Sequence, residues 1–299
     1  MISGITPILI YTLIIYPAMI TIDHLTYSYR HGFTAISDAT ASIAPGIHLL
    51  LGENGAGKTT LLRLIAGLLF PSAGSVEADG CDMSRRCPST LKKVFMLPDS
   101  MEIPATTIRG FAGMHSRFYP TFSQETFEEN LHDFRLTGHE NFNQLSLGLR
   151  HKSLLAYVLA LGVDVLLLDE PANGLDIDSK KTLRNMLARC TGPDQTVIVS
   201  THTVSDLREL YDGLIMLSRG RLLLARPTWE IAEKISCVAT PIPPADALFT
   251  EQGPGVFLSV TANRGNEDSD LNYALLYSAL MSGARDAILN QINSQTSES

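Results

Sequence analysis

Positive charge is scarce in this sequence. Its 299 residues contain 23 lysines and arginines against 31 aspartates and glutamates, so the formal net charge is −8 at pH 7. A surface that neutralises a row of phosphates needs a basic excess, and we therefore expect no nucleic-acid partner. Because 45% of the residues are hydrophobic and 18% are charged, a largely disordered chain is excluded, and one large domain or two modest ones are expected.

Cysteine is also scarce. The four cysteines form no CxxC pair and have no histidines near them at zinc-binding spacing; they are Cys81, Cys87, Cys190 and Cys237. This pattern predicts neither a disulfide framework nor a structural metal site, and it is typical of a protein from a reducing compartment.

Charge is missing altogether from the first 22 residues. They lack the basic start and the cleavage site of a secretory signal, and Pro7 and Pro17 interrupt what would be a marginal membrane span. Met19 precedes a stretch in which apolar residues alternate, as in a strand. We expect residues 1–18 to be an extension outside the fold, as an early start codon would produce. Native protein with the intact mass of a chain that begins at Met1 would contradict this.

From residue 20 onward, short apolar strands alternate with amphipathic helices. Strands are predicted at 47–51, 94–97, 165–168, 196–200 and 214–218, and helices after Lys58, Asp178 and Thr203. This order is typical of an α/β protein whose mixed sheet is covered by helices.

Two changes of pattern divide the chain. Between Pro98 and Gln144 the strand pattern gives way to helical segments, which predicts a helical insertion. After Arg226 a segment rich in proline and glycine precedes one more strand and a helical end. We therefore expect a main domain, a helical subdomain within it and a small α+β extension of unknown role, at 19–226, about 99–161 and 227–299 respectively.

The segment "GENGAGKT", residues 52–59, fits the phosphate-loop pattern GxxxxGK[ST]. It follows a predicted strand and begins a predicted helix, so a chance glycine-rich turn is the poorer explanation. Backbone N–H groups and the Lys58 ammonium would face the β- and γ-phosphates, and the Thr59 hydroxyl could bind Mg²⁺. The candidate nucleotide-binding residues here are Asn54, Gly55, Gly57, Lys58, Thr59 and Thr60.

The segment "LLLDE" places two acids at the end of an apolar strand. In open α/β sheets, ligands bind at this carboxyl edge. Asp169 can hold Mg²⁺ while Glu170 polarises an attacking water. The alternative is a buried strand that ends in two solvated acids, and the phosphate loop upstream disfavours it.

The order of these and further motifs resembles that of the ATP-binding cassette (ABC) ATPases over roughly residues 20–225. After the phosphate loop come "LPDS", a helical region, "LSLGL", "LLLDE", "NGLD" and "STH". The resemblance implies that His202 hydrogen-bonds the γ-phosphate and that Tyr29 stacks on adenine, with Tyr27 as the competing aromatic. It also implies that "NGLD" contacts a second subunit, although Asp176 or Asp178 could equally cap a helix there.

The "LSLGL" segment would be the signature loop, which closes over the nucleotide of the opposite subunit. Ser146 and Gly148 match that motif, whereas Leu147 replaces a glycine and Leu149 replaces the usual glutamine. Leucine at 147 removes flexibility but keeps the N–H donor.

Two further features mark the lineage. The pattern LSxGxxxK, which ends at Lys152, and the segment "FYPTFSQETFEENLHDFRL" resemble ATPases paired with ABC-2-type export permeases. Asp99 stands where the family has a glutamine, and it could still meet Mg²⁺ or water.

The resemblance thus implies a P-loop ATPase fold with ATP and Mg²⁺ as cofactors. It further implies a homodimer or heterodimer of ATPase subunits that energises a separate transmembrane permease, for export, from the cytoplasmic face of the membrane. Two alternatives remain open. One is a regulatory ABC subunit that binds ATP with little or no hydrolysis, and the other is an ABC ATPase without a transport role.

Overall fold

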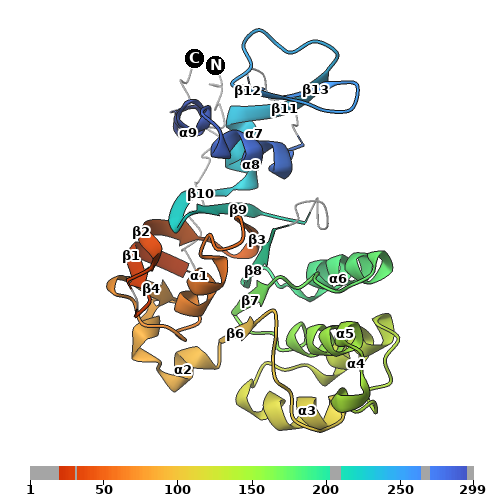
Figure 1. Ribbon diagram of the computed structural model, residues 1–299. Coiled ribbons are helices and arrows are strands. Elements are labelled where there is room, and N and C mark those ends of the chain that lie inside the picture. The colour runs from red at the N-terminus through yellow and green to blue at the C-terminus, as the bar shows by residue number, and fades with distance from the viewer. Residues whose placement is uncertain (1–19, 31, 203–209, 264–269, 295–299) are drawn as a thin grey trace, which may run out of the picture.

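The computed structural model describes residues 20–30, 32–202, 210–263 and 270–294 (Figure 1). The expected extension, residues 1–18, and the helix expected after Thr203 lie outside these ranges. None of the helices within them is long and apolar enough to cross a membrane.

A six-stranded sheet forms the centre of the molecule, in the order β10-β9-β3-β8-β7-β6. All of its strands are parallel except β10, which pairs with β9 in the antiparallel direction. The strands are β3 (Gly46–Leu51), β6 (Val94–Leu97), β7 (Val165–Asp169), β8 (Thr196–Thr201), β9 (Gly213–Ser218) and β10 (Arg221–Pro227). The five strands predicted in this region are present, and β10 was not predicted.

An antiparallel sheet lies against one face of the central sheet, with a helix between them (Figure 1). Its strand order is β2-β1-β4-β5, and β1 contains the expected alternation, since Ile20, Ile22 and Leu25 are buried. The elements are β1 (Ile20–Ser28), β2 (Thr34–Ile43), β4 (Ala73–Ala78), β5 (Cys81–Asp82) and α1 (Lys58–Ile65), with the short α2 (Pro88–Leu91) nearby.

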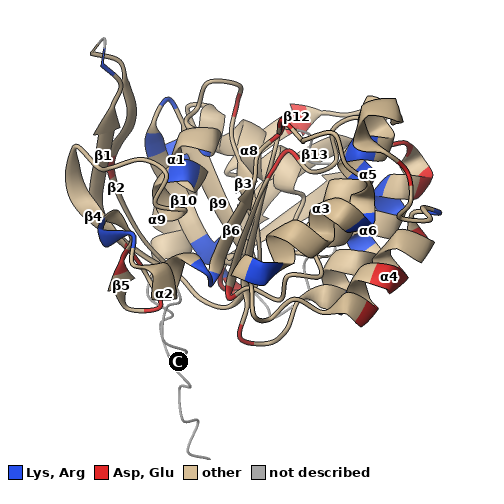
Figure 2. Ribbon diagram, turned by 90° about the horizontal axis from the view of Figure 1, so that it is seen from below, with Lys and Arg blue, Asp and Glu red and all other residues tan. Residues whose placement is uncertain are grey.

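A helical lobe follows β6, as the sequence predicted. Hydroxyl and carboxylate side chains cap its helices: Thr107 caps α3 and Ser123 caps α4, each by accepting a backbone N–H of the first turn. Figure 2 shows these helices grouped on the side of the sheet away from α1 and α2. They are α3 (Ile108–His115), α4 (Gln124–Asp133), α5 (Leu147–Val158) and α6 (Ile177–Cys190).

The C-terminal region continues from β10 and packs on the central sheet. Its three-stranded sheet has the order β11-β13-β12. One hydrophobic cluster includes residues of this region together with residues of β3 and β9, so their cores are continuous. The elements are α7 (Thr228–Lys234), β11 (Ile235–Thr240), β12 (Phe249–Gln252), β13 (Phe257–Ala262), α8 (Tyr273–Met281) and α9 (Arg285–Asn293).

The helical end expected from the sequence consists of two helices, α8 and α9. The chain breaks between α8 and α9, where the Ser282 hydroxyl donates to the carbonyl of Ala279 and accepts the N–H of Ala284. Serine competes for backbone hydrogen bonds in this way, and the following Gly283 weakens a helix further.

Tyr157 lies at the centre of the helical lobe and generates a stability prediction. It is 1% exposed, and its hydroxyl has no hydrogen-bond partner in the described part of the chain. Burial raises the pKa of this phenol. Its ring centroid lies 5.3 to 6.4 Å from those of Phe95, Phe111, Phe122 and Phe127.

We expect Tyr157→Phe to raise the free energy of unfolding by up to about 1 kcal/mol, because it removes a buried polar group that lacks a partner. Tyr157→Ala should lower the same quantity by about 3 to 5 kcal/mol, because it leaves a cavity. Denaturant unfolding of the three proteins measures both effects. A Tyr157→Phe variant that is less stable than the wild type would show that the hydroxyl has a stabilising partner.

Candidate functional site

The phosphate loop joins β3 to α1, and contacts with strand β2 and with the β9–β10 turn fix its path. Gly57 precedes α1 with φ of 108°, and a Cβ there would lie 2.5 Å from the carbonyl oxygen of Ala35. Only glycine fits such a position. From the β9–β10 turn, the N–H of Gly220 donates to the carbonyl of Ala56 at 3.0 Å. The loop is therefore held from behind while its N–H groups remain on the open side.

Lys58 is 7% exposed and lies under the loop. Its ammonium donates to the carbonyl of Gly52 at 2.7 Å and lies 3.5 Å from Oε1 of Glu170. A buried ammonium needs such partners, because its charge is costly away from water. The lysine is thus placed where a bound phosphate could take over its hydrogen bonds.

Asp169 connects the loop to the strands behind it. Its Oδ2 accepts the Thr59 hydroxyl at 2.7 Å, and its Oδ1 accepts the Ser200 hydroxyl at 2.6 Å. A hydroxyl and a carboxylate side by side are oxygen ligands of the kind that Mg²⁺ prefers, so these residues fit the expected metal. The sequence identified Thr59 and Asp169 but not Ser200, because only strand pairing brings β8 next to Asp169.

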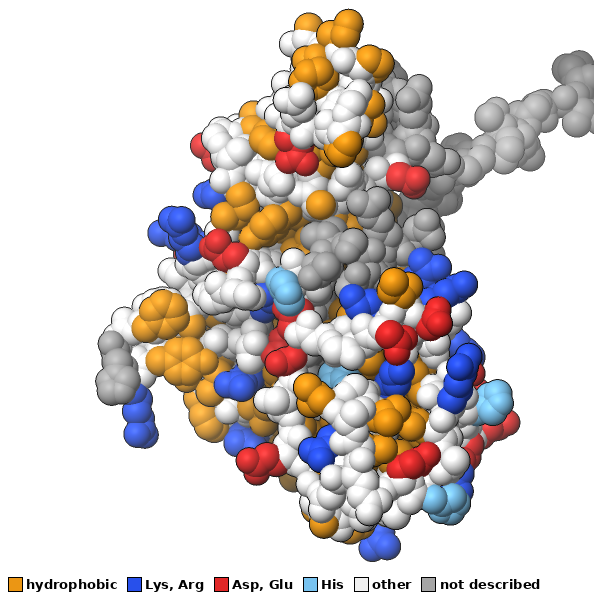
Figure 3. Space-filling model, turned by 45° about the vertical axis from the view of Figure 1, so that its right-hand side comes forward, with side chains coloured by type: hydrophobic (Ala, Val, Ile, Leu, Met, Phe, Trp, Pro, Cys, Tyr) orange, Lys and Arg blue, Asp and Glu red, His pale blue; other side chains and the backbone are white. Residues whose placement is uncertain are grey.

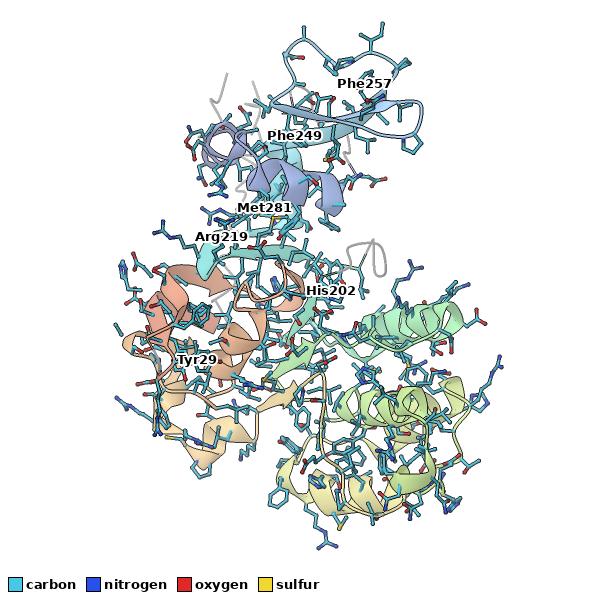
Figure 4. The ribbon with its side chains drawn as sticks, viewed as in Figure 1. Tyr29, His202, Arg219, Phe249, Phe257 and Met281 are labelled. Carbon is cyan, nitrogen blue, oxygen red and sulfur yellow. The ribbon has the colours of Figure 1, made fainter. Side chains whose placement is uncertain are left out.

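Glu170 follows β7 in a left-handed backbone conformation, with φ of 51°. This is uncommon for a residue other than glycine and costs about 1 to 3 kcal/mol. Its N–H donates to the carbonyl and hydroxyl oxygens of Ser200 at 3.1 and 3.0 Å. The turn directs its carboxylate towards His202, whose Nδ1 lies 2.9 Å from Oε2. Glu170 and His202 therefore form a pair at the carboxyl edge of the sheet, where Figure 4 labels His202.

These residues surround a cavity of about 280 Å³. Nine of the thirteen predicted site residues line it, and Phe33, Ala35 and Glu53 complete the lining. The predicted residues in the lining are Asn54, Gly55, Gly57, Lys58, Thr59, Thr60, Asp99, Asp169 and Glu170. His202 reaches the site through Glu170, whereas Tyr29, Ser146 and Gly148 are not in the lining.

Two aromatic side chains lie at the open end of the cavity. The Tyr29 hydroxyl is 3.0 Å from Oγ1 of Thr60, and its ring packs edge-on against Tyr27. Phe33 is 62% exposed and lines the cavity itself. The sequence gave no reason to choose Phe33, because its place depends on the turn in which the Tyr29 N–H donates to the Phe33 carbonyl at 2.9 Å.

Asp99 lies between the cavity and the "NGLD" segment. Its Oδ1 accepts the side-chain amide of Asn173 at 3.0 Å. The acid that replaces the family's glutamine thus joins the end of β6 to the segment after Glu170.

The "LSLGL" segment begins α5. Ser146 caps this helix, because its hydroxyl oxygen accepts the N–H of Leu149 at 3.3 Å. Leu147 is 80% exposed, so its side chain is not part of the core. Figure 3 shows hydrophobic side chains at the surface of the helical lobe. Ser146 and Gly148 therefore lie at a helix N-terminus that does not line the cavity of their own chain.

Two contacts tie α5 to the "NGLD" segment. The ring Nε2 of His151 donates to the carbonyl of Pro171 at 2.8 Å, and burial lowers the pKa of this histidine. Lys152 lies 3.0 Å from Asp176. Asp176 caps α6, and the N–H and hydroxyl of Ser179 together with Lys152 hold the pKa of its carboxyl well below the usual range. The capping alternative for "NGLD" thus describes Asp176, while Asp178 lies in the first turn of α6.

A family model described as "ABC transporter" matches residues 37–173. Similar solved structures include an ATP-binding subunit of an ABC transporter, with a TM-score of 0.65 at 21% identity, covering 71% of this chain and 91% of that one. Another is a dimeric ATP-binding cassette in a post-hydrolysis state with ADP and Pi, with a TM-score of 0.62 at 23% identity, covering 70% and 98%. These structures share the fold described above.

Two relatives extend the likeness to sequence. An ABC transporter ATP-binding protein of Geobacter sulfurreducens is 32% identical over 71% of this chain and 79% of its own length. The ABC transporter ATP-binding protein NatA of Bacillus subtilis is 30% identical over 63% of this chain and 80% of its own length. With the phosphate loop, Asp169 and Glu170 joined in one cavity, the chain belongs to the family of ABC transporter ATP-binding proteins, and it is an ATPase that uses ATP and Mg²⁺.

Proposed function

We propose that this chain is the nucleotide-binding subunit of an ABC exporter, which pairs with a second ATPase subunit and energises a separate membrane permease. The observation that carries the pairing is the separation of Ser146 and Gly148 from the cavity that holds Lys58 and Glu170. One chain thus holds both halves of a site without joining them. Two chains in head-to-tail contact would join each signature helix to the opposite cavity.

The residues of the cavity have separate tasks in this proposal. Lys58 and the loop N–H groups bind the phosphates, and Thr59 with Asp169 would hold Mg²⁺, which neutralises charge on the phosphate oxygens. Glu170 accepts a hydrogen bond from the attacking water. His202 orients the Glu170 carboxylate through its Nδ1. Its other ring nitrogen, Nε2, hydrogen-bonds the γ-phosphate.

The direction of transport is proposed from the lineage features. The LSxGxxxK pattern ends at Lys152, and its ion pair with Asp176 joins the signature helix to the "NGLD" segment. Both segments face the second subunit in this arrangement. Leu147 and Leu149 depart from the general signature of the family, but the exporter-type pattern LSxGxxxK leaves both positions unspecified, so Lys152 supports the exporter assignment. The permease would hold the subunit at the cytoplasmic face of the membrane, and the helical lobe would dock to it.

The permease proposal is tested in membranes of the native organism that carry the tagged chain. We expect a polytopic membrane protein to copurify with it in detergent, and Glu170→Gln to retain that partner. ATP-driven efflux in vesicles that contain both proteins would support export. ATP-driven transport towards the cytoplasmic side would overturn the assignment of export and leave the proposal of a permease partner intact.

Glu170→Gln should lower steady-state ATP hydrolysis by about 100-fold or more, because the amide cannot polarise water as the carboxylate does. ATP binding should remain, because Lys58 and the loop are unchanged. Glu77→Gln, an exposed residue of β4, is the matched control and should hydrolyse ATP at the wild-type rate. If Glu170→Gln hydrolyses ATP at more than a tenth of the wild-type rate, Glu170 is not the residue that polarises the attacking water.

Position 147 tests whether "LSLGL" is a working signature. Leu147 is the first residue of α5, and Ser146 before it has φ of −60° and ψ of 161°, which suits a residue followed by proline. Leu147→Pro therefore removes the N–H donor without breaking the helix, whereas Leu147→Gly removes the side chain and keeps the donor.

We expect wild-type ATPase activity per subunit to rise cooperatively with protein concentration. Leu147→Gly should stay within about threefold of the wild type, and Leu147→Pro should lose about tenfold or more, a loss typical of removing one phosphate-binding donor. If the wild type binds ATP without turnover and Leu147→Gly restores it, the chain is an ATP-binding regulatory subunit instead.

A further inference from the structure

A second cavity, of about 800 Å³, opens at the amino edge of the central sheet. It is lined by residues 44–48, 191–193 and 227–229 together with Ala188 and Asp212. The parallel strands β3 and β9 begin here, at Gly46 and Gly213, whereas the phosphate loop follows the opposite end of β3. Among the described residues, none lines both this cavity and the one that holds Lys58. The amino-edge cavity is therefore separate from the nucleotide site.

The size and lining of the amino-edge cavity suit a small organic molecule. Pockets for such ligands measure about 300 to 1,000 Å³ and combine an apolar lining with a few polar groups. The apolar lining here includes Pro45, Ile47, Pro193 and Trp229. Trp229 is the only tryptophan in the chain and is 60% exposed. Its ring thus offers a large apolar surface to a ligand in the cavity.

Asp212 places a carboxylate in the same cavity. Its Oδ2 accepts the N–H of Ile47 at 2.8 Å. A Cβ at Gly46 would lie 2.8 Å from this oxygen, so glycine makes room for the carboxylate at the start of β3. The two oxygens of a carboxylate offer about four acceptor positions. Asp212 can therefore accept hydrogen bonds from a ligand while it holds Ile47.

Thr228 joins Trp229 to Asp212. The backbone N–H and the hydroxyl of Thr228 both donate to the carbonyl of Asp212, at 2.8 and 3.1 Å. Trp229 is the next residue, in the first turn of α7, which Figure 1 shows beside β10. The indole ring and the carboxylate thus line one cavity from adjoining segments.

The charges of the lining favour a cation. Of the described residues that line the cavity, none is lysine or arginine, and Asp212 supplies the carboxylate. His48 adds no positive charge, because burial lowers the pKa of its imidazole and its Nε2 donates to the carbonyl of Ala44 at 2.8 Å. A carboxylate and the face of an indole ring both attract an ammonium ion. An anionic ligand would instead be repelled by Asp212.

We propose that the amino-edge cavity binds a primary ammonium ion that carries an apolar or aromatic body. The ammonium donates to Asp212 beside the Trp229 ring, and the body packs on Pro45, Ile47 and Pro193. This site goes beyond the ATPase function and does not depend on it. Because β3 runs from this cavity to the phosphate loop, the ligand stabilises the strand that carries the loop.

Three probes that share a phenyl body test the charge requirement. They are 4-phenylbutylammonium, the neutral 4-phenylbutan-1-ol and the anionic 5-phenylpentanoate. Each is titrated into the full wild-type chain; the emission of Trp229 reports binding in the cavity, and calorimetry gives the Kd.

We expect the ammonium to change the Trp229 emission and to have a Kd about tenfold or more below that of the alcohol, because hydrogen bonds between charged groups are strong. The anionic probe should bind most weakly. Saturating ammonium should raise the thermal midpoint of unfolding, because it binds the folded chain.

Three variants assign the contacts. Asp212→Asn removes the charge but keeps an oxygen for the Ile47 N–H, so it should raise the Kd of the ammonium about tenfold and leave that of the alcohol within about twofold. Asp194→Asn removes an exposed carboxylate outside the lining and is the matched control, which should keep the wild-type Kd. Trp229→Leu keeps an apolar side chain without the ring, and calorimetry should show a Kd about threefold or more above that of the wild type.

The proposal is overturned if the ammonium binds no more tightly than the alcohol, or if Trp229 emission stays constant while calorimetry detects binding. It is also overturned if folded Asp212→Asn keeps the wild-type Kd. The comparison of the three probes uses the wild type, so it remains decisive if a variant does not fold. A wild-type chain that does not hydrolyse ATP would refute the proposed function and leave this site unaffected.

Discussion

The site depends on the hydrogen bonds that join Thr59, Asp169 and Ser200. These residues belong to the elements after β3, in β7 and in β8, and the parallel register pairs Asp169 directly with Ser200. Two short hydroxyl-to-carboxylate bonds, of 2.7 and 2.6 Å, fix both oxygens of a side chain that is 3% exposed. A buried carboxylate without hydrogen-bond partners would destabilise the fold. The arrangement therefore requires the carboxyl ends of β3, β7 and β8 to be aligned.

The same alignment determines the conformation of Glu170. Its N–H is held by Ser200, so the chain must turn sharply after β7, and the left-handed backbone follows from that constraint. The turn brings the carboxylate near both Lys58 and His202. The carboxylate thus lies between the ammonium of Lys58 and the imidazole of His202. The packing of three buried strands offsets the cost of the strained turn.

Much of this arrangement could be predicted because it is encoded locally. The phosphate loop follows a strand and begins a helix, and Asp169 ends an apolar run, so sequence neighbours alone placed both at one sheet edge. Ser200 and Phe33 could not be found this way, since strand pairing brings one to the site and a turn brings the other. Strand β10 was not predicted, although its apolar run at 222–225 is as long as the one at 94–97; it continues the sheet as an antiparallel hairpin after Gly220. The break after α8 depends on side-chain hydrogen bonds of Ser282, which a periodicity pattern does not contain.

Continuity of the core changes how the C-terminal region should be understood. Composition separates it from the main domain, yet residues of α8 belong to the same buried cluster as residues of β3, the strand that ends in the phosphate loop. This shared core restricts how β3 and the loop after it can move, because close-packed interiors transmit small shifts instead of absorbing them. In the proposed function, a bound phosphate would replace the hydrogen bond that Lys58 donates to the carbonyl of Gly52. A shift of this shared core would therefore also reach the loop that holds Lys58.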